Sequence, residues 1–415
     1  MSSLTAWGQR TDSPAMQLDL TDPAFLTDPD ETLSRLRAEG GLVRTRIPLI
    51  GQVWLTTTDA GARALLKSPD LFVRDFGTVG GKPLSAKFWW LPGFMKPLLA
   101  GILGQDGADH TRLRGMVDSA FARSSIDDLR PKLRSIADTL LDSADPAKPC
   151  DIVSRYARPL PLTAICTLLG VPEEDQGKVA HWVSPVSGPV TPWGIARALP
   201  GLWRLTRYFR ADFSAQRAAP RPGLIGDLVQ VRDGTDRLSD DELLAMVVVL
   251  FIAGHETTVH LISNALHRVL QDDALRQGLI AAPETVGLLV EEVLRHDSPV
   301  MMTKPLFATR DTTFEGQALK AGDQVAALLI GANHDPARHS EPAAFTADRR
   351  PNAHLGFGTG PHVCLGMQLA RAEAQVAITT LLDRYPQAQL DGAAQRLRRV
   401  GLNGFSKLPV RLAPK

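Results

Sequence analysis

One cysteine stands in a glycine-rich stretch that runs from Phe357 to Gly366, directly before a segment with helical spacing that begins at Met367. The start of a helix offers unpaired N–H groups and the positive end of the helix dipole, which together favour a thiolate at Cys364. Glycines lack a Cβ, so the backbone can come close to whatever the sulfur binds. A lone cysteine is more often a half-buried structural residue. A thiolate with backbone donors around it nevertheless suits a buried haem iron, to which it donates electron density.

A second group of polar residues interrupts an apolar segment. Residues 243–253 are continuously apolar, and the run then meets Gly-His-Glu-Thr-Thr at 254–258. Polar side chains in the middle of a buried helix cost free energy unless they form bonds or do chemistry. Two explanations are open: Thr257 bonds back to the preceding turn and bends the helix, or Glu256 and Thr257 transfer protons. The apolar run is shorter than the roughly 20 residues of a membrane span, so we expect a helix that crosses a protein core.

Two further pairs of polar residues have helical spacing. Glu292 and Arg295 are three residues apart, which places them side by side on one helix face, as in many surface ion pairs. His110 and Arg114 are four residues apart, which is also the spacing of a solvated helix face. Because histidine and arginine give charge-assisted hydrogen bonds, the second pair also suits the binding of carboxylates.

The composition is that of a globular protein. Of 415 residues, 44% are hydrophobic and 22% are charged, which predicts a substantial core. A net charge of +1 gives no reason to expect nucleic acid or an anionic membrane as a partner. The three cysteines, at 150, 166 and 364, predict no disulfide framework and fit a reducing cytosol. The first ten residues hold no apolar core, so we expect no signal peptide and no membrane anchor, and therefore a cytoplasmic chain.

Helical spacing dominates the chain. A capping box at Ser239 and Glu242 predicts the start of a long helix that runs to residue 270. Alternating β-branched and aromatic residues predict a strand from residue 52, and short strands with turns are expected between 300 and 332. The sequence therefore predicts one mainly helical domain with small sheets over residues 1–415, of which about 1–17 form a flexible extension. Further helices are expected over 30–39, 59–67, 110–122, 127–142, 158–169, 203–217 and 283–295.

The glycine-rich stretch resembles the haem-binding signature of the cytochrome P450 family. The pattern FGxGxHxCxG is far more specific than a short glycine motif. The segment at 253–257, the Glu292/Arg295 pair and the His110/Arg114 pair resemble other motifs of this family, in the same order along nearly the full chain. The residues that meet the signature are Phe357, Gly358, Gly360, His362, Cys364 and Gly366.

The resemblance implies the fold and the cofactor. It implies the P450 fold, mainly helical with small sheets, with haem b (iron protoporphyrin IX) held between the long central helix and the helix that follows the cysteine. Cys364 is then the axial ligand of the iron. Glu256 and Thr257 stand at the acid–alcohol position that delivers protons during oxygen activation. The small residues Ala253 and Gly254 leave room for O2 beside the helix.

The resemblance also assigns the two charged pairs. His110 and Arg114 bind the haem propionates, and His362 belongs to the same group. Glu292 and Arg295 are structural and lock the region behind the haem together with a second arginine, for which Arg349 is our candidate.

One position departs from the family pattern. The strand after Ser298-Pro299 usually supplies an arginine to a propionate, about where Leu306 stands. Lys304 lies two residues earlier, on the same side of a strand, and is a candidate substitute. The departure puts the propionate-binding set in doubt and not the haem.

Electrons and substrate must come from outside the chain. The sequence holds no dinucleotide fingerprint and no cluster-forming cysteines, so we expect a ferredoxin or flavodoxin-type donor with its NAD(P)H-dependent reductase. Arg112 and Arg371 are possible docking contacts, or ordinary surface arginines. The segments expected to face the substrate are heavily apolar, which predicts a hydrophobic small molecule. The expected pocket residues are Phe76, Trp89, Trp90, Phe94, Met301, Met302 and Phe405.

The leading prediction is a monomeric monooxygenase that inserts one oxygen atom from O2 into a C–H bond or a double bond, by hydroxylation or epoxidation. A peroxide-dependent or rearranging haem-thiolate enzyme is an alternative, although such relatives commonly lack the acid–alcohol pair. A non-catalytic haem sensor is another alternative, and it predicts no product and no substrate-dependent change in iron spin state. Among terpenoid, steroid, fatty acid, aromatic and polyketide substrates the sequence makes no choice.

Overall fold

The computed structural model describes residues 16–47, 51–81, 92–123, 126–146, 148–187, 192–231 and 237–413. Most of the expected N-terminal extension lies outside these ranges, as do the expected pocket residues Trp89 and Trp90. Residues 16 and 17, which were predicted to belong to this extension, instead form strand β1 (Met16–Gln17), which pairs in parallel with the next strand of a sheet.

The largest sheet has six strands in the order β1-β2-β3-β9-β6-β4. Its outer strand β4 pairs antiparallel with β6, so that Phe72 lies opposite Ala308 and Val73 lies opposite Phe307. Apolar residues on β2, β3 and the helices beside them bury one core, with Leu33, Leu36 and Leu55 at or near zero exposure. The strands after β1 are β2 (Leu42–Ile47), β3 (Gly51–Thr56), β4 (Phe72–Val73), β6 (Leu306–Ala308) and β9 (Gln324–Ala327).

Three smaller sheets complete the β structure. Strand β13 (Pro409–Arg411) lies between β10 (Gln389–Leu390) and β5 (Cys150–Asp151). The other two are hairpins, in which β7 (Thr312–Phe314) pairs with β8 (Gln317–Leu319) and β11 (Gln395–Arg396) pairs with β12 (Phe405–Lys407).

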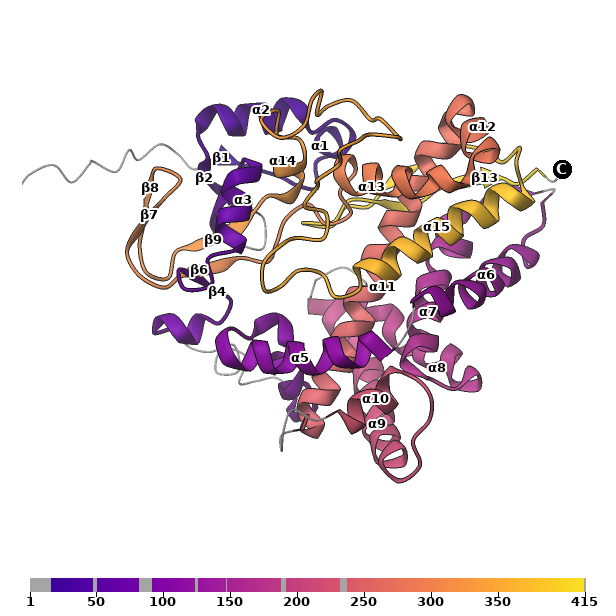
Figure 1. The fold of residues 1–415 in the computed structure, drawn as a ribbon, viewed down its shortest axis with the longest axis horizontal. Helices are drawn as coiled ribbons and strands as arrows, with labels where there is room; N and C mark the ends of the chain where they lie inside the picture. The colour runs from indigo at the N-terminus through magenta and orange to yellow at the C-terminus, as the bar shows by residue number, and fades with distance from the viewer. Residues whose placement is uncertain are drawn as a thin grey trace, which may run out of the picture.

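Helices form the rest of the described chain. Figure 1 shows α1–α3 and α14 around the large sheet, with α5, α9 and α10 at the opposite end of the molecule. Most predicted helices are confirmed within a few residues, and the helix expected at 203–217 begins earlier, at Pro192. The sequence analysis missed α1, α8, α10, α12 and α14, the last of which begins where only short strands with turns were expected. Shorter turns of helix include η1 (Phe76–Val79) and η2 (Gly93–Ala100). The α-helices are α1 (Pro23–Thr27), α2 (Asp30–Glu39), α3 (Asp59–Leu66), α5 (Gly107–Arg123), α6 (Ile126–Asp142), α7 (Pro159–Leu169), α8 (Glu173–Val183), α9 (Pro192–Ala218), α10 (Leu224–Gln230), α11 (Asp240–Gln271), α12 (Asp273–Ala281), α13 (Val286–His296), α14 (Leu329–Asn333) and α15 (Met367–Arg384).

Helix α11 is the long central helix, and the predicted capping box opens it. The Ser239 hydroxyl accepts a hydrogen bond from the Glu242 N–H (3.3 Å), while the Glu242 carboxylate accepts one from the Ser239 N–H (2.8 Å). By length and composition α11 could cross a membrane, and no other described helix meets these two criteria. Most of its apolar stretch is buried inside the protein, where it packs against α7, α15 and η2. The prediction of a core-crossing helix is therefore confirmed.

Candidate functional site

The loop from Phe357 to Gly366, which we call the cysteine loop, is shaped by two of its glycines. The backbone N–H of Cys364 donates to the Phe357 carbonyl oxygen (3.0 Å) and closes the loop. Gly358 and Gly360 have φ angles of +68° and +76°, which side chains with a Cβ rarely adopt. A Cβ at Gly360 would also lie 2.1 Å from the Leu66 carbonyl oxygen, so the loop passes close against the end of α3. A Cβ at Gly366 would meet nothing within 4 Å, which leaves open space beside the cysteine.

The expectation that its setting favours a thiolate at Cys364 is wrong for the protein alone. Burial raises the pKa of the Cys364 thiol, and this outweighs the lowering by the Gly366 N–H and by the charges of Arg114 and Arg371. These three groups are nevertheless placed to stabilise an anionic sulfur. A metal ion that coordinates the sulfur removes the thiol proton outright, so thiolate formation at Cys364 depends on iron binding.

Two arginines hold the cysteine loop in place. Arg114 of α5 donates from Nη1 to the Val363 carbonyl oxygen (2.8 Å). The guanidinium of Arg371 in α15 lies 4.7 Å from the centre of the Phe357 ring and pairs with Glu291 at 2.7 and 2.8 Å. Arg371 is therefore engaged by the protein itself. Arg112, the other arginine considered for partner docking, forms an ion pair with Glu242.

Helix α11 is accessible at one point in its otherwise buried length. Ile252 keeps 37% of its surface exposed, although the helix around it lies in the core. Ala253 is likewise exposed, and Gly254 and Thr257 are half-buried. We call these four residues the open face of α11. An open face inside a core is where a large ligand would pack.

The open face carries the alcohol and the acid that the sequence singles out. The Thr257 hydroxyl donates to the Ala253 carbonyl oxygen (2.8 Å), so the expected bond to the preceding turn is present. Glu256 is buried, with 7% exposure, and its carboxylate pairs with Arg399. Burial raises the pKa of Glu256 despite the charges of Arg399 and Arg158, which lower it. A carboxyl group with a raised pKa exchanges protons more readily near neutral pH.

His255, the polar neighbour of Glu256, is buried with 3% exposure. Burial and the charge of Arg158 lower the pKa of His255 to about 4. It is therefore neutral at pH 7.

A cavity of about 160 Å³ lies between α5, α3 and the cysteine loop. The His110 and His362 rings face each other there, with centroids 4.1 Å apart. Burial, with help from Arg114 and His362, lowers the pKa of His110 to about 4, and burial also lowers the pKa of His362. Both rings are therefore mainly neutral at pH 7 and can donate one hydrogen bond each. The cavity is lined by Leu65, Leu66, Pro69, Phe72, Arg74, Asp106, Gly107, His110, Thr111, Leu306, Thr359, Pro361 and His362.

Arg74, which the sequence suggested only as a possible contact for a substrate carboxylate, lies on the wall of this cavity. Leu306, the position where the family pattern has an arginine, lies on it too. Lys304 keeps solvent-accessible surface, yet burial and the nearby charge of Arg74 lower its pKa.

The Glu292, Arg295 and Arg349 side chains meet behind the cysteine loop. Arg295 donates to the Glu292 carboxylate at 2.8 and 2.7 Å, and neither side chain has any exposed surface. Arg349 donates from Nε to the same carboxylate at 3.2 Å. Asn333 ties the cluster to the loop, because its carbonyl oxygen accepts from Arg295 (3.0 Å) and its Oδ1 accepts from the Leu355 N–H (2.7 Å).

The described members of the expected substrate pocket divide into two groups. Met301 and Met302 are buried in the core beside the large sheet. Phe405 is buried in the main helical core, between the His267 ring (4.4 Å) and the Arg396 guanidinium (4.3 Å). These three side chains are packing residues in this structure. Phe76 and Phe94 keep accessible surface on η1 and η2.

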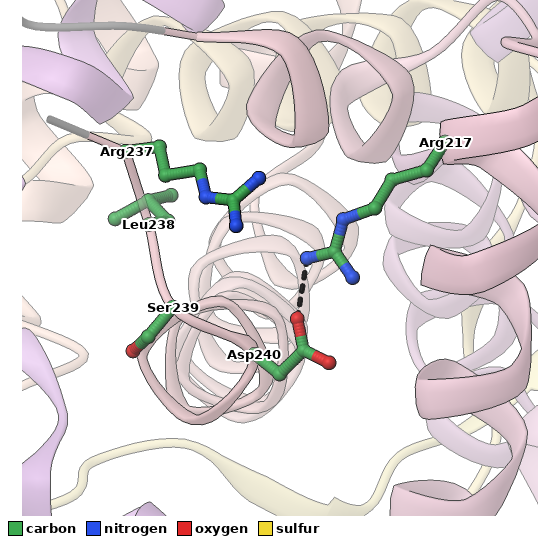
Figure 2. A pocket seen from close by; sticks show the side chains of 5 residues that line it. All are labelled: Arg217, Arg237, Leu238, Ser239 and Asp240. Carbon is green, nitrogen blue, oxygen red and sulfur yellow. Dashed lines mark hydrogen bonds and ion pairs between the residues drawn. The ribbon is translucent and has the colours of Figure 1, made fainter. Parts of the chain in front are cut away.

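A second pocket lies at the other end of α11. Figure 2 shows Arg217 reaching from α9 to the Asp240 carboxylate, with Arg237 on the opposite side. Asp240 is the first residue of α11, roughly 20 Å along the helix from Ala253 at 1.5 Å per residue. Ion-paired surface residues line this pocket, so we place the candidate site at the open face and the cysteine loop instead.

The residues present fit a haem. A half-buried cysteine near the Gly366 N–H, an open face on the central helix, and a cavity lined by Arg74, His110 and His362 supply an iron ligand, a packing surface and partners for carboxylates. Sequence reasoning gave no role to Asp106, Glu291 and Arg399, and it considered Arg74 for a substrate carboxylate and not for the haem. Each acts through contacts between distant segments, and no local spacing marks these four residues.

Comparisons with known proteins agree with this geometry. Residues 284–407 match the family described as Cytochrome P450. The chain is 33% identical to cytochrome P450 monooxygenase PikC of Streptomyces venezuelae over 413 residues, which cover 98% of this chain and 96% of that protein. The structure matches that of the Bacillus subtilis polyketide synthase P450 PksS with a TM-score of 0.85 and 31% identity, covering 95% of this chain and 99% of that one. It matches a myxobacterial P450, CYP267B1 in complex with myristic acid, with a TM-score of 0.85, 34% identity and the same coverage.

Proposed function

The chain belongs to the cytochrome P450 family, and from this premise we propose that it inserts one oxygen atom from O2 into a hydrophobic small molecule, by hydroxylation or epoxidation. The haem supplies the chemistry of oxygen activation when it is bound. Two electrons reach it from a ferredoxin or flavodoxin-type donor, which an NAD(P)H-dependent reductase reduces.

The open face of α11 carries this proposal. A fully packed core helix would bury Ile252 and Ala253, whereas here both are accessible and the acid and alcohol residues follow them directly. The side chains of Ala253 and Gly254 are the smallest available, so O2 has room against the helix. Cys364, on the loop that precedes α15, would hold the haem iron through its sulfur.

Glu256 and Thr257 deliver protons at this face. Glu256 is the acid of the pair: burial raises the pKa of its carboxyl group, and Arg399 holds that group through its contact at Oε1, so Oε2 is the oxygen left to take up and release a proton. The Thr257 hydroxyl donates its hydrogen to the Ala253 carbonyl oxygen. The hydroxyl oxygen of Thr257 can therefore accept a hydrogen bond from the acid or from water. Proton transfer through such a pair keeps the protons away from uncontrolled contact with solvent.

The substrate is an apolar molecule with carbon chains or fused rings. Of two similar proteins, one is a P450 of a polyketide synthase and the other was solved in complex with myristic acid, and both point to apolar carbon skeletons. Phe76 and Phe94 are the described aromatic residues with accessible surface that fit this role.

The absorption spectrum of the dithionite-reduced protein with carbon monoxide tests the ligand assignment. We expect a strongly red-shifted Soret band for the wild-type protein, and we expect Cys364→Ser to lose both this band and oxygen insertion. Cys150→Ser, at a half-buried cysteine on β5, is the matched control and should keep both. Full oxygen insertion by Cys364→Ser would overturn the proposed function.

A further inference from the structure

The cavity beside the cysteine loop contains a guanidinium without a partner. Arg74 Nε is buried and has no hydrogen-bond partner. Its own main-chain N–H and that of Asp75 donate to Asp106 Oδ2 at 2.6 and 2.9 Å, so this carboxylate oxygen is already occupied. A buried charged donor that stays unpaired costs free energy, which points to a ligand that pairs with it.

Asp106 is the carboxylate that lines this cavity. Burial lowers the pKa of Arg74, and the charge of Asp106 does not outweigh this. The Arg74 side chain makes no ion pair within the described part of the chain, and the second oxygen of Asp106 lies 3.8 Å from His362 Nε2. A cavity with a guanidinium that has no ion pair of its own suits an anionic ligand.

The register of strands β4 and β6 explains why Arg74 lies at this cavity. In the antiparallel pair of β4 and β6, Phe72 lies opposite Ala308 and Val73 opposite Phe307, and Figure 1 shows the two strands side by side. The next pair in this register is Arg74 and Leu306. Directly opposite residues have Cβ atoms about 4.5–5.5 Å apart on the same face of the sheet. Both residues also line the same cavity, which supports this extension of the register by one pair.

We propose that Arg74 binds a haem propionate in place of an arginine on the neighbouring strand at Leu306. Its guanidinium lies on the wall of the cavity that Leu306 also lines. Haem b carries two propionates, and His110 and His362 on the same cavity are the candidates for the second one, whereas Arg114 is already engaged by Asp118 and by the Val363 carbonyl oxygen. The inference rests on the binding of haem, which is part of the proposed function.

Haem transfer from the purified holoprotein to an excess of apomyoglobin measures this interaction directly. We expect Arg74→Gln to speed the transfer by about 10-fold to 100-fold, the range for loss of a buried hydrogen bond to a charged group. The double variant with Arg74→Leu and Leu306→Arg returns the guanidinium to β6 and should transfer haem more slowly than Arg74→Leu alone. Arg204→Gln, on the exposed side of α9, is the control and should match the wild type.

Two results would overturn the proposal. One is a wild-type transfer rate in Arg74→Gln, and the other is a double variant that is no better than Arg74→Leu. If Arg74→Gln yields no folded holoprotein, Arg74→Lys keeps the charge and should fold with faster haem transfer; failure of that variant to fold would assign Arg74 a purely structural role. The carbon monoxide spectrum of each variant separates the two proposals, because it reports ligation by Cys364 and not the rate of haem loss.

Discussion

Replacing Glu292 by glutamine tests the buried cluster behind the cysteine loop. The Glu292 carboxylate accepts hydrogen bonds from Arg295 (2.8 and 2.7 Å), Arg349 (3.2 Å to both oxygens), the Thr346 N–H (2.8 Å) and Asn352 Nδ2 (3.0 Å). Glutamine has nearly the same shape but no charge, and its amide nitrogen would face these donors. Glu292→Gln therefore leaves buried positive charge uncompensated and one donor without an acceptor.

Glu292→Gln exchanges one oxygen for an NH2 group, yet the expected loss in the free energy of unfolding is large. Removing one partner of a fully buried ion pair costs about 3–5 kcal/mol. Unfolding a 415-residue chain changes the entropy by about 0.9 kcal/mol per kelvin, at about 2.1 cal/mol/K for each residue. The melting temperature should therefore fall by about 3–6 °C. Haem should also be lost earlier, because Asn333 connects this cluster to Leu355 at the start of the loop.

Thermal unfolding followed by far-UV circular dichroism and by Soret absorbance measures both effects. Glu284→Gln removes an exposed carboxylate from the turn before α13 and is the matched control, expected to change the melting temperature by less than about 1 °C. A shift of the same small size in Glu292→Gln would refute the reasoning, since it would mean that the buried charges are compensated without this carboxylate.

Three further substitutions test the site. Thr257→Ala should bind substrate normally but divert reducing equivalents to hydrogen peroxide, because the alcohol of the proton pair is lost; an unchanged ratio of product to NAD(P)H consumed would contradict this role. Gly360→Ala should weaken haem retention far more than Gly358→Ala, since both have positive φ but a Cβ at 360 alone meets the Leu66 carbonyl oxygen, at 2.1 Å; equal haem retention in the two variants would show that this contact is unimportant. Burial raises the pKa of Glu291, but Arg371 and His354 outweigh it and lower this pKa to about 2. The stabilisation by Glu291 is therefore complete above about pH 4.5 and is lost as the pH falls toward 2. Glu291→Gln should lower the melting temperature at pH 7, with a difference from wild type that shrinks between pH 4.5 and 3; a constant difference would argue against the ionised pair.

Local interactions explain why much of the fold could be predicted. The capping box at Ser239 and Glu242, the helix boundaries near 30–39 and 127–142, and the Glu292/Arg295 contact all depend on residues within one or two helical turns. The cysteine loop is likewise a local structure, because its turns need glycine at fixed positions. Spacing along the chain is sufficient to predict such features.

Contacts between distant segments account for what could not be predicted. Met301, Met302 and Phe405 are apolar, and composition alone does not distinguish a pocket lining from a core; packing assigned them to cores. The pKa of Cys364 is raised by burial, although the cysteine stands just before a helix, because the desolvation of a thiolate outweighs the stabilisation by nearby donors.

The sequence by itself determined the family and marked Cys364 as the candidate haem ligand and Glu256 and Thr257 as the candidate acid–alcohol pair, since these depend on residue types at short, fixed spacing. Only the tertiary structure paired Glu256 with Arg399, 143 residues away, and brought Arg74 and Leu306 to the wall of one cavity. The physical reason is that a charge buried by folding needs a partner in space, and the partner's place in the sequence is set by how the strands and helices pack.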